Sequence, residues 1–131
     1  MDEEVTAICI DNGTGQIKAG FAGDEAPRTI FRTLLGKPKV PQSASEPQFG
    51  KDCLGKSSVL QVSNPIERGI VRDWDDMERI WHHTLHTELK VQPEDHPIIM
   101  TEASLTPKHS REALTKIMFE KFNVPCLYVS S

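Results

Sequence analysis

The feature that most constrains this chain is a pair of apolar runs joined by a short turn, Asn12-Gly13-Thr14-Gly15. The first run is rich in β-branched residues and ends at Asp11, and the second extends from Gln16 to Ala22. Two such runs on either side of an Asn-Gly turn are typical of an antiparallel β-hairpin. The sequence therefore predicts a hairpin whose turn carries two glycines.

The residues of this turn also suggest a chemical role. Gly13 and Gly15 can adopt positive φ and carry no Cβ, so several backbone N–H groups can point into one concavity that suits an anion such as phosphate. Thr14 adds a hydroxyl donor and Lys18 a positive charge. Asp11, at the end of the first strand, is a carboxylate that could hold a metal ion through water. The alternative is an ordinary hairpin turn, and the turn by itself does not separate the two interpretations.

Further strands are predicted along the chain. Gly23–Arg28 forms a second connection, and Thr29–Phe31 then adds a short strand, which extends the hairpin into an antiparallel meander. The apolar positions of this meander are dense enough that we expect both of its faces to be covered. His96–Thr101 is predicted to be a buried strand, and Cys126–Ser131 begins another.

The segment from Gly36 to Ser58 differs in character from the rest of the chain. Prolines, lysines, serines and glycines accumulate, and Phe49 and Leu54 are its substantial apolar anchors. This composition predicts an exposed, mobile excursion. A short strand is expected after it, at Val59–Val62.

Two helices are predicted from periodicity and start signals. The first begins after Asp73, which can cap free N–H groups, and ends near Lys90; the second begins at Thr106-Pro107 and runs to about Phe122. Apolar residues at helical spacing place one face of each helix in a core. These residues are Met77, Ile80, Trp81, Leu85 and Leu89 in the first helix, and Ala113, Leu114, Ile117, Met118 and Phe122 in the second.

Several polar residues allow a functional and a structural interpretation. His82 and His86 are four apart and could share a metal ion, but zinc needs a third protein ligand and His83 occupies the place where a zinc hydrolase has glutamate. We therefore interpret the three histidines as a solvated or hydrogen-bonded helix face. Glu102 follows a buried strand, where ligands gather in open α/β sheets, but a structural hydrogen bond is the favoured interpretation.

Composition excludes several classes of protein. A net charge of −4 and a pI near 5.7 disfavour binding to nucleic acid, which usually requires a basic face. No apolar run reaches membrane-spanning length, and the acidic start Met1–Glu4 does not resemble a secretion signal. Cys9, Cys53 and Cys126 are odd in number and widely spaced, which predicts reduced core thiols in an intracellular protein.

Asp11–Arg28 closely resembles the first phosphate loop of actin and the actin-related proteins. Other segments resemble actin in the same order along the chain: Pro65–Val71, Trp74–Thr84, His96–Ala103 and Phe119–Pro125. The resemblance implies an α/β fold, the first lobe of the actin-like ATPase (ribonuclease H-like) fold. In this fold a mixed β-sheet is flanked by helices and carries a small mobile insertion.

The resemblance also implies a division of the chain and a set of ligands. Residues 1–35 and 65–131 would form the core lobe, and residues 36–64 a small insertion subdomain that is shorter than in the family. ATP would bind with Mg²⁺ or Ca²⁺, and Asp11 would hold the cation through its water shell. The phosphates would contact Gly13, Thr14, Gly15, Gln16 and Lys18.

The implied partners are actin or actin-related subunits and actin-binding proteins, in the cytoskeleton of the cytoplasm or in the nucleus. Family members are slow ATPases and considerably longer, so we expect this chain to be an amino-terminal piece. It lacks the second phosphate loop and the water-positioning glutamine, and we expect it to be inactive alone. The alternative is a non-catalytic module that binds actin partners without nucleotide turnover.

Three departures from the family pattern indicate a divergent member. Lys37–Glu46 is polar and contains prolines where the family has an apolar loop that contacts the next filament subunit, which puts ordinary filament assembly in doubt. Arg68 stands where the family commonly has histidine, and a surface position is favoured for it. Ser104 is the third departure.

Overall fold

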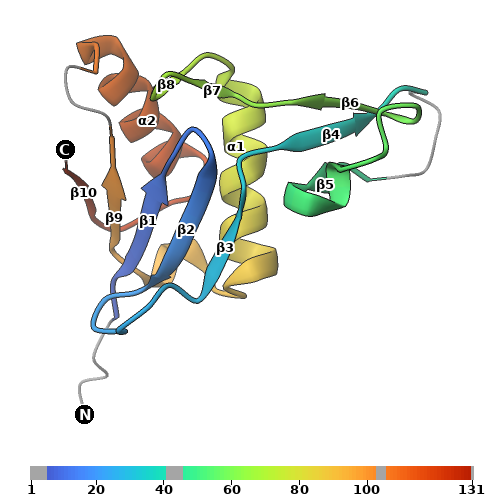
Figure 1. The fold of residues 1–131 in the computed structure, drawn as a ribbon. Coiled ribbons are helices and arrows are strands. Elements are labelled where there is room, and N and C mark those ends of the chain that lie inside the picture. Colours follow the sequence, from blue (N-terminus) through green and yellow to red (C-terminus); the bar gives the residue numbers. More distant parts are fainter. Residues whose placement is uncertain (1–5, 41–45, 103–105, 131) are drawn as a thin grey trace.

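The structure is a computed structural model, and it describes residues 6–40, 46–102 and 106–130. Its main sheet has five strands in the order β10-β9-β1-β2-β3 (Figure 1). Strands β1, β2 and β3 are antiparallel neighbours, whereas β1, β9 and β10 run parallel, so the sheet is mixed. The strands are β1 (Ile8–Asn12), β2 (Gln16–Phe21), β3 (Thr29–Arg32), β9 (Ile98–Thr101) and β10 (Leu127–Ser130).

The predicted hairpin is confirmed in its position and register. Strands β1 and β2 pair so that Ile10 lies opposite Ala19 and Asp11 lies opposite Lys18. Successive side chains of a strand point to opposite faces. Ile10 and Ala19 are accordingly buried in the core, whereas Asp11 and Lys18 are exposed on the other face.

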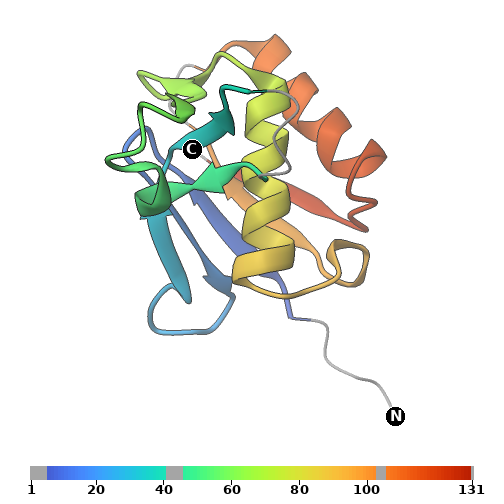
Figure 2. The same ribbon diagram turned by 90° about the vertical axis from the view of Figure 1, so that its right-hand side faces the viewer.

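Two helices pack against one face of the main sheet, as Figures 1 and 2 show together. Helix α1 (Trp74–His82) continues without a break into the π-helical segment η2 (His83–Glu88), and α2 is Lys108–Glu120. Asp73 caps α1, because its carboxylate accepts a hydrogen bond from the Asp76 N–H at 3.0 Å. A 3₁₀ turn, η3 (Pro93–Asp95), follows the first helical segment.

Both predicted apolar stripes reach the core, with small differences. All five stripe residues of the first helical segment are buried, but Ala113 and Ile117 of α2 are only partly so. The cap of α2 lies at Pro107, within one residue of the predicted start. The core is formed by Ile8, Ile10, Ile17, Ala19, Ile98 and Met100 of the sheet with Met77, Ile80, Trp81, Leu85, Leu114, Met118 and Phe122 of the helices.

The expectation that both faces of the meander are covered is wrong for the part of the chain that the structure describes. Both long helices lie on the face that carries Ile10 and Ala19, and the opposite face is left open. Ile30 is 53% exposed and Tyr128 is 66% exposed on this open face. Across the described ranges, no helix has the length and apolar character needed to cross a membrane.

A second sheet projects from the main one and has the strand order β5-β4-β6. Its parts are β4 (Leu35–Pro38), β5 (Gln48–Phe49), the 3₁₀ turn η1 (Gly50–Cys53) and β6 (Leu60–Ser63). The predicted excursion therefore contains a sheet, and the strand expected at Val59–Val62 is confirmed within one residue. A short pair, β7 (Ile66–Glu67) and β8 (Ile70–Val71), leads from this sheet to α1.

The apolar anchors of the small sheet differ from those predicted. Leu54 is 50% exposed, so its assignment as an anchor is wrong, whereas Cys53 and Leu60 are buried. The prediction failed because Leu54 follows a 3₁₀ turn that points Cys53, one residue earlier, into the sheet. Of the three thiols, all free, Cys53 is buried and Cys126 is exposed, so a core position is wrong for Cys126.

A buried carboxylate connects the small sheet to α1. Asp76 accepts hydrogen bonds from Lys37 of β4 at 3.1 Å and from Arg79 of α1 at 3.0 Å. Ser63 of β6 adds a longer contact to the same carboxylate at 3.4 Å. Both longer strands of the small sheet are thus joined to one residue of the helix.

Candidate functional site

The turn between β1 and β2 closes through a hydrogen bond from the Gly13 N–H to the Gln16 carbonyl at 3.0 Å. A Cβ on Gly13 would lie 2.6 Å from that same oxygen, so only glycine fits this position. Gly15 has no atom within 4 Å of its ideal Cβ position. Neither glycine is among the residues with positive φ, so close approach to the Gln16 carbonyl, and not a left-handed conformation, is what requires glycine at position 13.

The three carbonyl groups of the turn all accept hydrogen bonds from the protein. The buried Thr33 binds two of them, its hydroxyl donating to Gly13 O at 2.7 Å and its N–H to Gly15 O at 3.1 Å. The side-chain amide of Asn64 donates to Thr14 O at 2.7 Å. Because C=O and N–H point in opposite directions in a trans peptide, the next N–H groups, those of Thr14, Gly15 and Gln16, point away from these donors.

The side chain of Thr14 is held by the residues that follow the small sheet. Its hydroxyl oxygen accepts a hydrogen bond from the Gly69 N–H at 2.9 Å. A hydroxyl that accepts one hydrogen bond still has its own proton to donate. Gly69 has φ 80°, and Asn64 fixes the same segment by accepting from the Ile66 N–H at 2.8 Å. Thr14 therefore has a set position, and its hydroxyl proton has no acceptor among residues 6–40, 46–102 and 106–130.

Asp11 is oriented by a short network that begins in the core. The indole N–H of Trp81 donates to the side chain of Asn12 at 3.0 Å, and the Asn12 N–H donates to the Thr101 hydroxyl at 3.0 Å. That hydroxyl donates to Asp11 at 2.8 Å. The carboxylate is thus fixed at the carboxyl end of β1, with its second oxygen outside this network.

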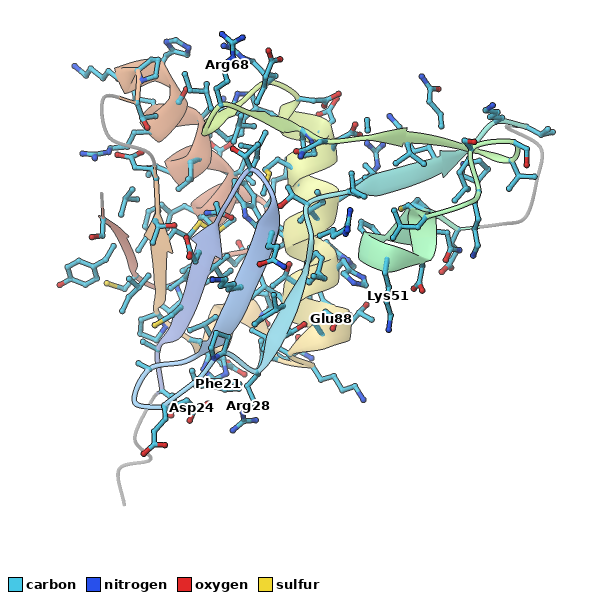
Figure 3. All side chains as sticks on the ribbon, viewed as in Figure 1. Phe21, Asp24, Arg28, Lys51, Arg68 and Glu88 are labelled. Atoms are coloured by element: carbon cyan, nitrogen blue, oxygen red, sulfur yellow. The ribbon has the colours of Figure 1, made fainter. Side chains whose placement is uncertain are left out.

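Asp11 and Lys18 share a hollow of about 310 Å³ on the open face of the main sheet. Thr101 also lines it, and the chain from Ala19 to Pro27 forms its far wall. At that wall, the Arg28 guanidinium lies 4.9 Å from the centre of the Phe21 ring and forms an ion pair with Asp24 at 3.2 Å (Figure 3). A carboxylate, an ammonium group and a hydroxyl therefore face one space, but the turn residues Asn12–Gln16 do not line it.

All six residues predicted for the site, Asp11, Gly13, Thr14, Gly15, Gln16 and Lys18, lie in or directly beside the hairpin turn. Sequence reasoning did not find Thr33, Asn64 and Gly69, which hold the turn in place. They are distant in sequence from the turn, and no local pattern connects them to it. An Asn before a proline was the only hint, and it also suits an ordinary turn.

The other residues that the sequence singled out lie outside the hairpin turn. The carboxylate of Glu102 pairs with Arg111, which confirms the structural interpretation of Glu102. His83 pairs with Glu88 at 3.0 Å, and no group of three or more potential ligands that could hold a metal ion occurs within residues 6–40, 46–102 and 106–130. Arg68 is exposed, as predicted. Ser104 and half of the divergent Lys37–Glu46 segment, residues 41–45, lie outside the described residues.

A family model described as actin matches residues 2–131. The chain belongs to the actin family. The predicted family and fold class are confirmed, since an actin domain with a mixed sheet and flanking helices is consistent with the first lobe of the actin fold. Actin-family proteins bind nucleotides in general.

The turn of this actin-family domain fits a nucleotide phosphate by its chemistry. Backbone N–H groups of successive residues can form an anion-binding concavity, and the Thr14 hydroxyl and the Lys18 ammonium would add a donor and a positive charge. Asp11 supplies one carboxylate, which suits a divalent cation that keeps most of its water shell.

Proposed function

We propose that this actin-family domain binds ATP with Mg²⁺ or Ca²⁺ at the turn between β1 and β2. The N–H groups of Thr14, Gly15 and Gln16 would bind phosphate oxygens, and the Lys18 ammonium would neutralise their charge. Asp11 would hold the cation through water. The observation that supports the proposal is that the carbonyl groups of Gly13, Thr14 and Gly15 accept hydrogen bonds from Thr33 and Asn64. The N–H groups on the opposite sides of these peptides, those of Thr14, Gly15 and Gln16, are therefore directed away from those donors.

Calorimetric titration of the 131-residue chain with ATP and magnesium tests this proposal. Lys18→Ala removes a charge-assisted contact worth about 1.5–3 kcal/mol, which corresponds to roughly tenfold to a hundredfold weaker binding. Lys56→Ala is the matched control, because Lys56 is also an exposed lysine but lies between η1 and β6 of the small sheet, outside the hollow. Equal affinities for the two variants would contradict the proposed site.

The role of Asp11 is tested by comparing ATP binding with and without magnesium. Asp11→Asn keeps the shape of the side chain and removes its charge, so the gain in affinity from magnesium should shrink. Asp75→Asn, at an exposed position on α1, should retain the full gain. If both variants keep the full gain in ATP affinity from magnesium, the cation is not held by Asp11.

We also propose that residues 1–35 and 65–131 act as a core lobe and residues 36–64 as a small subdomain, since each has its own sheet. Strand β4 begins at Leu35, so the boundary falls at the first residue of that strand. The linkage through Asp76 would then set the orientation of the subdomain.

A second candidate is an interaction module that binds actin-type subunits or actin-binding proteins in the cytoskeleton of the cytoplasm or in the nucleus, without nucleotide turnover. The open face of the main sheet favours it, because Tyr128 and Ile30 are exposed there and β10 is an edge strand. Co-sedimentation of the purified chain with actin filaments tests this candidate. No association at micromolar concentration would rule it out.

A further inference from the structure

A second cavity, of about 370 Å³, lies between β3, the small sheet and the end of the first helical segment. Two aromatic side chains, Phe31 of β3 and Phe49 of β5, line it. Two cations, Arg32 and Lys51, lie along the same cavity, and so do His83 and Glu88. Its residues thus come from both sheets and from η2, and most of them are distinct from the proposed phosphate site.

The aromatic walls of this cavity are fixed by His83. Its imidazole stacks on Phe49 with ring centres 4.2 Å apart and planes at 14°, and it meets Phe31 edge to face at 5.3 Å and 85°. Its Nε2 lies 3.0 Å from Glu88, whose other carboxylate oxygen accepts from the Thr29 hydroxyl at 2.9 Å. The apolar lining is therefore formed before any ligand arrives.

The charges along the cavity are unbalanced. Both oxygens of Glu88 are already bound, by His83 and Thr29. Within the described ranges, neither Arg32 nor Lys51 lies within ion-pair distance of a carboxylate, although both are exposed beside this cavity. Two cations against one carboxylate, beside an aromatic lining, suit a ligand that carries both a negative charge and an apolar group.

The position of Lys51 depends on Gly50. Gly50 has φ 62°, and a Cβ on it would lie 3.2 Å from the Cβ of Phe31. Its N–H donates to the Leu34 carbonyl at 3.0 Å, which holds η1 against the end of β3. Figure 3 shows Lys51 extending from η1 on the side where Glu88 lies. The close approach of η1 thus brings the second cation to the cavity.

We propose that this cavity docks a segment of a partner protein in which an acidic residue stands beside an apolar one. The carboxylate of the segment lies between Arg32 and Lys51, and its apolar side chain packs against Phe31 and Phe49. Ile30 also lines the cavity, but it is 53% exposed and lies on the opposite face of β3 from Phe31. This proposal does not depend on ATP binding, because none of these five side chains belongs to the proposed nucleotide site.

Titration of the isotope-labelled chain with a short peptide, acetyl-Glu-Leu-Glu-Phe-amide, followed by nuclear magnetic resonance, tests the proposal. The peptide should shift the signals of Phe31, Phe49 and His83 in a saturable way, and added salt should weaken the binding. Its neutral analogue, with Gln in place of Glu, should bind at least about tenfold more weakly, because it loses the charge-assisted contacts.

Variants then identify the cations that bind the peptide. Lys51→Glu should weaken peptide binding by about tenfold or more, and Lys51→Gln should weaken it by less. Lys56→Glu is the control: it makes the same charge change on the small subdomain but outside the cavity, so it should have little effect. Equal weakening by Lys56→Glu, equal binding of the neutral peptide, or no shifts at millimolar peptide would overturn the proposal. Identical shifts with inorganic phosphate alone would also overturn it, since they would indicate a simple anion site.

Discussion

Replacing Asp76 with Asn is the most informative test of how the small sheet is held to α1. The substitution keeps the size of the side chain and its contact with Ser63 but removes the negative charge that Lys37 and Arg79 bind. The Asp76 side chain is 4% exposed, whereas Lys37 is 41% and Arg79 is 48% exposed. The Asp76 carboxylate is therefore buried, whereas the side chains of Lys37 and Arg79 remain partly exposed to solvent.

The expected loss follows from these exposures. A hydrogen bond to a charged group contributes about 1.5–3 kcal/mol when buried, and solvent around the two cations reduces each contact to about 1 kcal/mol. We therefore expect the free energy of unfolding to fall by about 2 kcal/mol. For a domain of this size that lowers Tm by about 6–8 °C.

Thermal unfolding followed by circular dichroism measures this loss, with Asp75→Asn as the control. Asp75 is an exposed neighbour in the same first turn, so its substitution removes only a favourable interaction with the helix dipole, worth about 0.3–1 kcal/mol. Hydrogen exchange should show faster exchange in β4 and β6 of the Asp76→Asn variant, with β1 and β9 less affected. If the two variants melt within a degree of each other, the carboxylate does not hold the small sheet.

Three further predictions concern the turn, a histidine and the thiols. Gly13→Ala should lower the free energy of unfolding by about 1–3 kcal/mol in denaturant titrations, because its Cβ meets Gln16 O at 2.6 Å, whereas Gly15→Ala should be much milder. Burial lowers the pKa of His83 by more than the nearby Glu88 carboxylate raises it, so the folded state disfavours protonation of this side chain. The contribution of His83 to stability should be full above about pH 6.5 and be lost as pH falls through the folded pKa. His83→Gln should reduce this loss. A thiol reagent should label the exposed Cys126 in the native protein, but it should label Cys53 only on unfolding, because Cys53 is buried and burial raises the pKa of its thiol. Equal labelling rates for Cys126 and Cys53 in the native protein would contradict the packing of the small sheet.

The parts of the fold that sequence predicted well are those encoded over short distances. The hairpin follows from two apolar runs around Asn12-Gly13, and α1 follows from a cap at Asp73 and apolar residues three and four apart. Both signals lie within about a dozen residues. All six predicted site residues share the turn for the same reason.

The parts that were missed depend on distant pairing. Strand β4 was not predicted: it pairs with β6, so that Leu35 lies opposite Ser63, and it shows no strong pattern by itself. Thr33 and Asn64 orient the turn, but each is a common polar residue whose partner is fixed only by the fold. The open face was missed because apolar density in a strand does not indicate how many layers cover it.

The parallel pairing of β1 with β9 has a consequence for synthesis of the chain. Ile8 lies opposite Ile98, so one side of the central strand stays without its neighbour until Ile98, 90 residues later in the chain, has left the ribosome. At about 5–20 residues per second this interval lasts on the order of ten seconds. During that time the nascent hairpin presents unpaired backbone and the side chains of Ile8 and Ile10 to its surroundings, which makes it a natural target for a chaperone that binds emerging chains.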